Sequence, residues 1–151
     1  MPETAIVDAS ALIVLEKLNL LHILCKLYSQ IILPEAVINE FGTPTIDCYS
    51  VRKIERSMVK LLVGDSNLGK GEAEAIALAY ETGMKMVIDD LKARKVAATL
   101  DLSFTGTIGI LLKAERLSLI DSAYNKTKEL RDKGFHVSDQ LLDNISRFKI
   151  S

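Results

Sequence analysis

The chain has 151 residues, 48% of them apolar and 26% charged, and its 19 basic and 20 acidic residues give a formal net charge of −1. This composition excludes intrinsic disorder and a collagen-like repeat, and the length predicts one domain over residues 1–151. The near-neutral charge lacks the basic excess of a typical nucleic-acid-binding protein. A nucleic-acid partner would therefore require basic residues gathered in one place.

Nothing in the sequence indicates a secreted, membrane or zinc-binding protein. The N-terminus lacks the basic, apolar and small-residue order of a signal peptide, and the apolar stretches are far shorter than the roughly 20 residues that cross a bilayer. Cys25 and Cys48 are not at metal-ligand spacing, and His22 and His136 are isolated from the cysteines and from each other. We expect a soluble protein of the reducing cytoplasm with no membrane partner.

In the first half of the chain, short apolar stretches alternate with helix-forming segments. Asn19 divides one apolar region into two short helices, while Pro34 suits the first position of a helix and Gly42 its end. The segment 43–50 has the least regular pattern. The predicted elements are a strand at 4–7, two helices within 11–27, a strand at 30–33, a helix at 35–41, a helix-compatible segment at 51–58 and an edge strand at 59–63.

The second half contains the clearest helix. Gly69-Lys70-Gly71 leads into it as a tight turn, without the full spacing of a nucleotide-binding loop, and Gly83 ends it. The short alternating units favour a parallel sheet flanked by helices. The predicted elements are helices at 72–82, at 91–100, from Gly106 or Thr107 to Arg116, at 122–133 and at 138–148, with strands at 86–88 and 103–105.

Acidic residues follow two of the predicted strands. Asp8 comes directly after the first strand, and Asp89 and Asp90 come after the strand at 86–88. Because ligands of parallel sheets bind at the carboxyl ends of the strands, these acids are candidates for a binding site. Each of them, like Ser10, also suits the N-cap of a helix, and the two roles are compatible.

Two glutamates on predicted helices extend this candidate site. On a helical wheel, Glu72 lies opposite Glu74 and Glu81, on the apolar side, where an unpaired charge would cost several kcal/mol while a helix N-terminus returns only about 0.3 to 1 kcal/mol. Glu40 lies at the margin of an apolar stripe and is equally well explained as a surface residue. Four carboxylates from four elements suit Mg²⁺ or Mn²⁺ and indicate metal-assisted hydrolysis.

Several motifs in the same order resemble the PIN-domain nucleases, whose largest branch is the VapC-type toxin ribonucleases. The resemblance is closest to a PIN-like prokaryotic subfamily and covers nearly the whole chain. The motifs that carry it are Val7-Asp8-Ala9-Ser10, Pro34-Glu35-Ala36-Val37, Gly69 to Ile76, Ile88-Asp89-Asp90 with Ala93-Arg94, and Thr105-Gly106-Thr107.

The resemblance implies an α/β protein, a three-layer α/β/α sandwich with a parallel sheet of four or five strands, that hydrolyses single-stranded RNA. It implies Mg²⁺ or Mn²⁺ on Asp8, Glu72 and Asp90, with Asp89 as the rival of Asp90. The ion would lower the pKa of a bound water and stabilise charge on the attacking and leaving oxygens. Glu40 completes the catalytic acids, and many members carry Asp where this chain has Glu72. A homodimer and an antitoxin protein are the implied protein partners.

The resemblance also implies that Ser10 and Thr107 support the acids. By residue type and position, the candidate RNA-binding residues are Lys70, Lys92, Arg94 and Lys95. A solvated ion pair is an equally good explanation of Arg94.

Two other functions compete with the nuclease. One is a PIN-fold binding or scaffolding module with little or no nuclease activity, which Glu at position 72 and the few basic residues around the site suggest. The other makes Asp8 a phosphate-accepting nucleophile. It is weak, because Ser10 stands where the corresponding phosphatases carry a second Asp.

Overall fold

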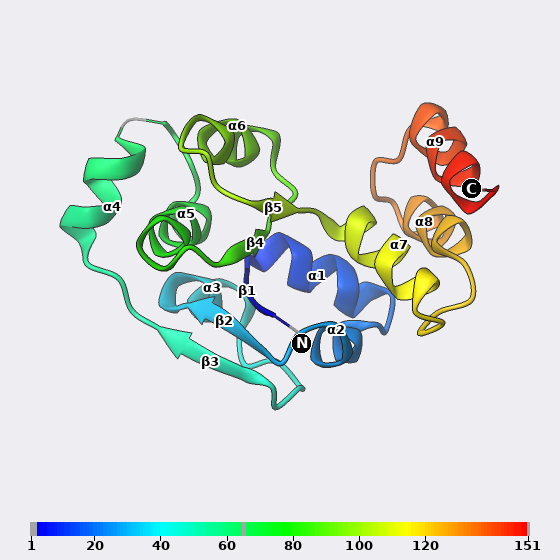
Figure 1. Ribbon diagram of the computed structural model, residues 1–151, viewed down its shortest axis with the longest axis horizontal. Coiled ribbons are helices and arrows are strands. Elements are labelled where there is room, and N and C mark those ends of the chain that lie inside the picture. The colour runs from blue at the N-terminus through cyan, green and yellow to red at the C-terminus, as the bar shows by residue number, and fades with distance from the viewer. Residues whose placement is uncertain (1–2, 65, 151) are drawn as a thin grey trace.

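The computed structural model describes residues 3–64 and 66–150, with side chains described as far as Phe148. Its centre is a sheet of five parallel strands in the order β3-β2-β1-β4-β5 (Figure 1). This arrangement confirms the predicted α/β fold, with the larger of the two expected strand numbers. The strands are β1 (Thr4–Val7), β2 (Gln30–Pro34), β3 (Tyr49–Arg52), β4 (Lys85–Val87) and β5 (Phe104–Thr105).

Helices cover both faces of this sheet and complete a three-layer α/β/α sandwich (Figure 1). Among the described residues, none of the helices has the length and apolar character needed to cross a membrane. The helices are α1 (Ala9–Lys17), the 3₁₀ turn η1 (Leu21–Ile23), α2 (Leu24–Leu27), α3 (Glu35–Phe41), α4 (Arg56–Val63), α5 (Lys70–Thr82), α6 (Leu91–Thr99), α7 (Thr107–Arg116), α8 (Ala123–Asp132) and α9 (Asp139–Ile150).

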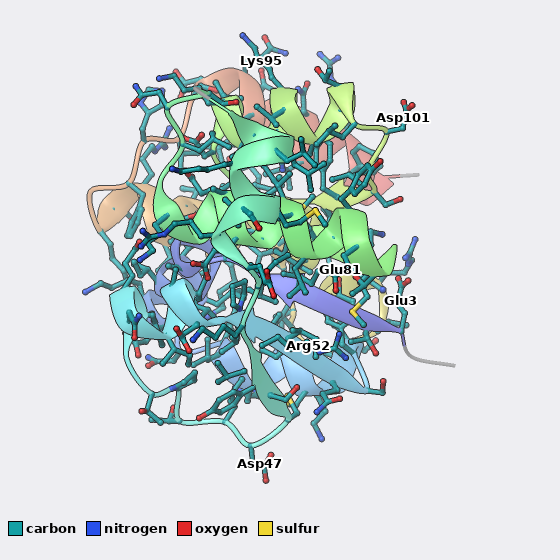
Figure 2. The ribbon with its side chains drawn as sticks, turned by 90° about the vertical axis from the view of Figure 1, so that its left-hand side faces the viewer. Glu3, Asp47, Arg52, Glu81, Lys95 and Asp101 are labelled. Carbon is teal, nitrogen blue, oxygen red and sulfur yellow. A yellow bond between two sulfur atoms is a disulfide. The ribbon has the colours of Figure 1, made fainter. Side chains whose placement is uncertain are left out.

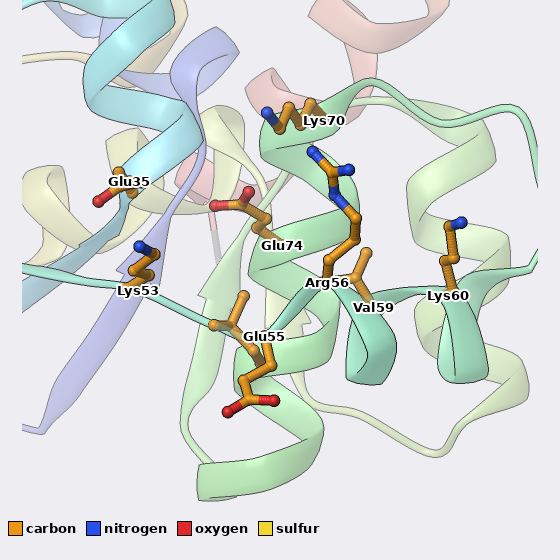
Figure 3. A pocket seen from close by; sticks show the side chains of 9 residues that line it. Glu35, Lys53, Glu55, Arg56, Val59, Lys60, Lys70 and Glu74 are labelled. Carbon is orange, nitrogen blue, oxygen red and sulfur yellow. The ribbon is translucent and has the colours of Figure 1, made fainter.

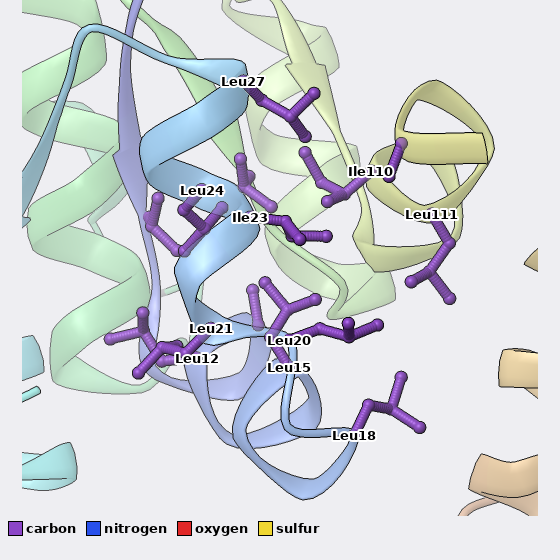
Figure 4. Close-up of a cluster of buried hydrophobic side chains, with 14 of the residues drawn as sticks. Leu12, Leu15, Leu18, Leu20, Leu21, Ile23, Leu24, Leu27, Ile110 and Leu111 are labelled. Atoms are coloured by element: carbon purple, nitrogen blue, oxygen red, sulfur yellow. The ribbon is translucent and has the colours of Figure 1, made fainter. Parts of the chain in front are cut away.

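Alternate residues along each strand face opposite helical layers. Ile6, Ile32 and Met86 belong to the core shared with α4, α5 and α6, and Figure 2 shows α4 and α5 toward the viewer. Val7 and Leu33 belong to the core shared with α1, α2, α7, α8 and α9. Leucine and isoleucine side chains of α1, α2 and α7 fill this second core (Figure 4). Both faces of the sheet are thus buried, as parallel sheets require.

The predicted order of helix and strand between residues 49 and 63 is wrong. The edge strand comes first, as β3, and within the described residues it pairs with β2 alone, whereas the segment predicted as a strand belongs to α4. Val59, Leu62 and Val63 pack into the core shared with α5, while Leu61 is 79% exposed. Positions 59, 62 and 63 follow the helical spacing, but four apolar residues within a five-residue segment do not distinguish a helix from a buried strand.

A disulfide bond joins Cys25 of α2 to Cys48, which directly precedes β3. The carbonyl oxygen of Cys48 accepts a hydrogen bond from Ile31 N at 2.9 Å, so the bond lies near the amino-terminal ends of β2 and β3. The spacing of 23 positions does not show that the two cysteines form a bond. They meet only because α2 and β3 lie beside the same end of β2 in the folded chain. The bond does not match the expectation of a reducing compartment, where thiols stay reduced.

Candidate functional site

The predicted acids lie at the carboxyl-terminal ends of the strands, on the side of the sheet opposite the disulfide bond. β1 and β4 are neighbours with Val7 paired to Val87, and Asp8 N donates a hydrogen bond to Val87 O at 3.2 Å. Asp8 therefore lies beside the chain that continues into Asp89 and Asp90. A pocket of about 190 Å³, called the acid pocket below, is lined by residues that include Asp8, Ser10, Glu40 and Glu72.

Asp8 is the most buried of these acids, with 1% of its surface exposed. Its Oδ1 accepts hydrogen bonds from Ala11 N and Ser10 Oγ, both at 3.0 Å, and so caps the N-terminus of α1. Its Oδ2 is buried and has no hydrogen-bond partner among the described residues. Leaving a buried carboxylate oxygen unpaired costs free energy, so Oδ2 is suited to receive a cation or a proton.

Burial raises the pKa of Asp8 from its ordinary value of 3.8 to about 7. The hydrogen bonds from Ala11 and Ser10 oppose this rise, whereas the neighbouring carboxylates of Asp89 and Glu72 add to it. With this pKa, Asp8 gains or loses its proton near neutral pH in the metal-free protein. A cation that binds there has to displace this proton.

Glu72 is half-buried, so the apolar side of the helix on which the sequence places it is not closed to solvent at this residue. It lies in the first turn of α5, where its Oε1 accepts a hydrogen bond from Gly69 N at 3.0 Å. Burial raises the pKa of Glu72, the Gly69 hydrogen bond lowers it, and the carboxylates of Asp90 and Glu40 raise it. Glu72 is therefore within electrostatic range of the acids on α3 and after β4.

The two acids after β4 have different surroundings. Asp89 binds the start of α7 with both oxygens: Oδ1 accepts from Thr107 N at 2.8 Å and Oδ2 from Thr107 Oγ1 at 2.6 Å. Asp90 is exposed and caps α6, its Oδ2 accepting from Ala93 N at 3.0 Å. Asp90 Oδ1 has no hydrogen bond among the described residues. Among these residues, Asp90 Oδ1 thus accepts no hydrogen bond, whereas each oxygen of Asp89 already accepts one from Thr107.

Arg94 is bound within the fold. Its Nε donates a hydrogen bond to Ile88 O at 3.0 Å, and its guanidinium carbon lies 5.4 Å from the centroid of the Phe104 ring. The solvated ion pair considered for Arg94 does not occur in the part of the chain that the structure describes. Gly106 is buried against the same group: a Cβ there would overlap the Arg94 guanidinium and lie 2.7 Å from Asp89 Oδ1.

Comparison with known proteins decides the family of this α/β chain. A family model described as PIN domain matches residues 4–149. The chain belongs to the PIN-domain family. This confirms the resemblance found in the sequence motifs. No curated protein matches the sequence significantly. PIN domains are generally nucleases that use divalent metals, so the match supports a hydrolase that acts on nucleic acid.

The acids of this PIN domain do not form a closed metal site as they are placed. Within residues 3–64 and 66–150, no three Asp, Glu, His or Cys side chains are close enough together to hold a metal ion. The chemistry of the donor set nevertheless fits a divalent cation, since the acid pocket offers carboxylate oxygens and the unpartnered Asp8 Oδ2. Binding an ion through three of these acids would require them to draw closer together.

The candidate RNA-binding lysines of the PIN domain are exposed but do not share one place. Lys70 is the first residue of α5 and lies between Gly69 and Gly71, which line the acid pocket. Lys92 and Lys95 are on α6, and Figure 2 shows Lys95 at the outer edge of the molecule. Among these lysines, only Lys70 adjoins the acid pocket through its chain neighbours.

Two contacts that join α3 to α5 are missed by sequence reasoning. Glu74 Oε1 accepts a hydrogen bond from Ala36 N at 3.0 Å, in the first turn of α3. The sequence gives one sign of the first contact: Pro34 at the N-cap has no side-chain acceptor, so the N–H groups that begin α3 need an acceptor from another element. The sequence does not show that Glu74 supplies it. Gly71 is already inside α5 and is not part of the expected turn, and a Cβ there would lie 3.2 Å from Val37 Cγ2. Gly71 therefore allows the two helices to approach closely.

Gly106→Ala is expected to lower the free energy of unfolding by about 1 to 3 kcal/mol, because the added methyl group has to displace Arg94 or Asp89 from its hydrogen bonds. Urea denaturation measures the change. In an Arg94→Ala background the same substitution should cost less, because one of the two colliding groups is gone. Full additivity of the two substitutions would contradict this explanation of Gly106.

Proposed function

We propose that this PIN domain is a divalent-metal-dependent endoribonuclease that hydrolyses phosphodiester bonds of single-stranded RNA. The observation that supports it most is the buried, unpartnered Oδ2 of Asp8 on a residue that lines the acid pocket. A structural N-cap needs only the other oxygen, Oδ1, which already binds Ala11 and Ser10. Oδ2 has no structural hydrogen bond among the described residues and can therefore bind an ion.

In this proposal Asp8, Glu72 and Asp90 hold Mg²⁺ or Mn²⁺, and Glu40 borders the site from α3. Asp90 is preferred to Asp89 because Asp90 Oδ1 accepts no hydrogen bond from the described residues, whereas both oxygens of Asp89 are held by Thr107. Ser10 fixes the orientation of Asp8 through its hydrogen bond. A bound ion would supply a water of lowered pKa and neutralise charge on the phosphate. Above pH 7 Asp8 is mainly ionised and ready to bind the ion.

The substrate and the biological setting come from the family resemblance. We propose RNA as substrate, a homodimer as the active form, and a role as the toxin of a toxin-antitoxin pair with an antitoxin protein as inhibitor. We also propose a cytoplasmic location. Since the cytosol keeps thiols reduced, this location requires the protein to stay folded with the Cys25–Cys48 bond open.

An RNA-cleavage assay tests the proposed activity. The full chain is incubated with a panel of single-stranded RNAs in Mg²⁺, in Mn²⁺ and in EDTA, and products are resolved on sequencing gels. We expect internal cleavage with either metal and none in EDTA. Cleavage that persists in EDTA would contradict the metal requirement, and single-stranded DNA cut equally well would contradict the choice of RNA.

The second candidate is a PIN-fold binding or scaffolding module with little or no nuclease activity. It is favoured by the open arrangement of the acids, no three of which are close enough to hold an ion among the described residues. Isothermal titration with Mn²⁺ separates the two candidates. Absence of both metal binding and cleavage supports the module, whereas metal binding that Asp8→Asn removes supports the nuclease.

A further inference from the structure

A second pocket, of about 890 Å³, lies on the side of α5 that faces α4 and the segment leading into it. Four cationic side chains of the described residues line it, and we call it the basic pocket (Figure 3). They come from two segments: the chain between β3 and α4 with α4 itself, and the start of α5. The four are Lys53, Arg56, Lys60 and Lys70.

These cations are available to a ligand. All four are exposed, and none forms an ion pair within the part of the chain that the structure describes. Three carboxylates among the described residues share the lining, so its formal net charge is +1. Glu74 accepts a hydrogen bond from Ala36 N at 3.0 Å, and Figure 3 shows the carboxylate of Glu55 directed away from Lys70. Glu35 is the remaining one, at the N-terminus of α3.

The basic pocket and the acid pocket are both lined by residues around the start of α5. Lys70 lines the basic pocket, while its neighbours Gly69 and Gly71 line the acid pocket. α3 spans the same interval, with Glu35 at the basic pocket and Glu40 at the acid pocket. Five residues of helix correspond to about 7.5 Å, so one extended strand can reach both pockets.

We propose that the basic pocket binds backbone phosphates of the same RNA strand that is cleaved at the acid pocket. This inference rests on the proposed nuclease function and adds the path of the substrate. No aromatic ring is among the described lining residues, and Ile54 and Val59 supply the apolar part. Binding is therefore by charge, with little choice of base.

The test measures RNA binding separately from cleavage. A short fluorescein-labelled oligouridine is titrated with the full chain in EDTA, and its anisotropy is followed at several salt concentrations. The test variant is Lys53→Gln/Arg56→Gln/Lys60→Gln. We expect it to bind roughly tenfold or more weakly at low salt, with a salt slope reduced by about 2, as the loss of three phosphate contacts on a single strand predicts.

The matched control is Lys126→Gln/Lys128→Gln/Lys133→Gln, which removes the same charge on and just beyond α8, in the other helical layer. It should change the affinity less than twofold, and circular dichroism should show both variants folded. Equal loss in both variants, no loss in the test variant, or no RNA binding by the parent chain would overturn the proposal. Tighter binding of an equally charged polyglutamate peptide, lost in the same variant, would assign the pocket to an acidic protein segment instead.

The cleavage assay keeps the two proposals apart. If the parent chain binds RNA through these residues but cleaves nothing with any metal, the nuclease proposal fails and the binding pocket stands. If the parent chain cleaves RNA and the test variant binds and cleaves equally well, the pocket assignment fails and the nuclease stands.

Discussion

Asp8→Asn is expected to reduce metal-dependent RNA cleavage roughly 100-fold or more, because the substitution removes the buried anionic oxygen proposed to bind the ion. Initial rates in saturating Mg²⁺ and Mn²⁺ measure the loss. Asp89→Asn serves as the comparison: it weakens the tie to Thr107 and should lower stability more than the cleavage rate at a temperature where it is folded. An Asp8→Asn protein that cleaves at the parent rate would remove Asp8 from the site.

The same substitution should stabilise the metal-free protein at alkaline pH. The folded pKa of about 7 is above the ordinary 3.8, so the folded chain holds the Asp8 proton more tightly than the unfolded chain does. The resulting stability is complete below about pH 4 and is lost as the pH rises to about 7. The loss is at most roughly 4 kcal/mol. Because Asn cannot ionise, the variant should gain little at pH 4 and most at pH 8.

Urea unfolding in EDTA at pH 4, 6 and 8 measures this gain. Asp143→Asn, on an exposed position of α9, is the control and should show no gain that grows with pH. Added Mg²⁺ should raise the stability of the parent chain at pH 8 and leave Asp8→Asn unchanged. If the stability of the parent chain and of the variant depended on pH in the same way, the pKa of Asp8 would not be raised in the folded protein.

Reducing the Cys25–Cys48 bond is expected to lower the free energy of unfolding by about 3 kcal/mol, because the bond closes a loop between residues 23 positions apart. Cleavage should survive, since the bond lies near the amino-terminal ends of β2 and β3 and the acids lie at the opposite edge of the sheet. Urea titrations with and without dithiothreitol measure the stability, and the RNA assay in the same buffers measures the activity.

Cys25→Ser/Cys48→Ser is the control for the reductant itself. Its unfolding midpoint should match that of the reduced parent chain and should not respond to dithiothreitol. Identical midpoints for oxidised and reduced parent protein would show that the bond contributes nothing to stability. An inactive reduced protein that is still folded would argue against a cytoplasmic enzyme.

Elements with their own start and stop signals could be predicted from the sequence. α3 ends at Gly42, and α5 ends at Gly83, whose φ of 75° lies in the left-handed region that glycine favours. The segment 49–63 lacked such signals. β3 has a single neighbour in the sheet, and a short apolar run in α4 fits either kind of element. The local sequence pattern could not show that β3 comes before α4, because α4 is a helix by virtue of its packing against α5.

The acid positions were predictable and their surroundings were not. Asp8 and the acids after β4 follow from the rule that strand ends share an edge. The ties between Asp89 and Thr107, 18 positions apart, join segments that meet only in the folded chain. The basic pocket was missed for a similar reason: Lys53, Arg56 and Lys60 lie in the segment whose helix and strand were exchanged.

Two sets of contacts hold the acids at the ends of the strands in two groups. In one, the Glu74 hydrogen bond and the close packing at Gly71 join α3 to α5, so Glu40 and Glu72 are carried together. In the other, Thr107 and Arg94 fasten the end of β4 to α6, β5 and α7. If the acids close around a cation, we expect the distance between these two groups to shorten while the contacts within each group are kept. Cross-links that join the two groups would then change the metal affinity, whereas cross-links within either group would leave it unchanged.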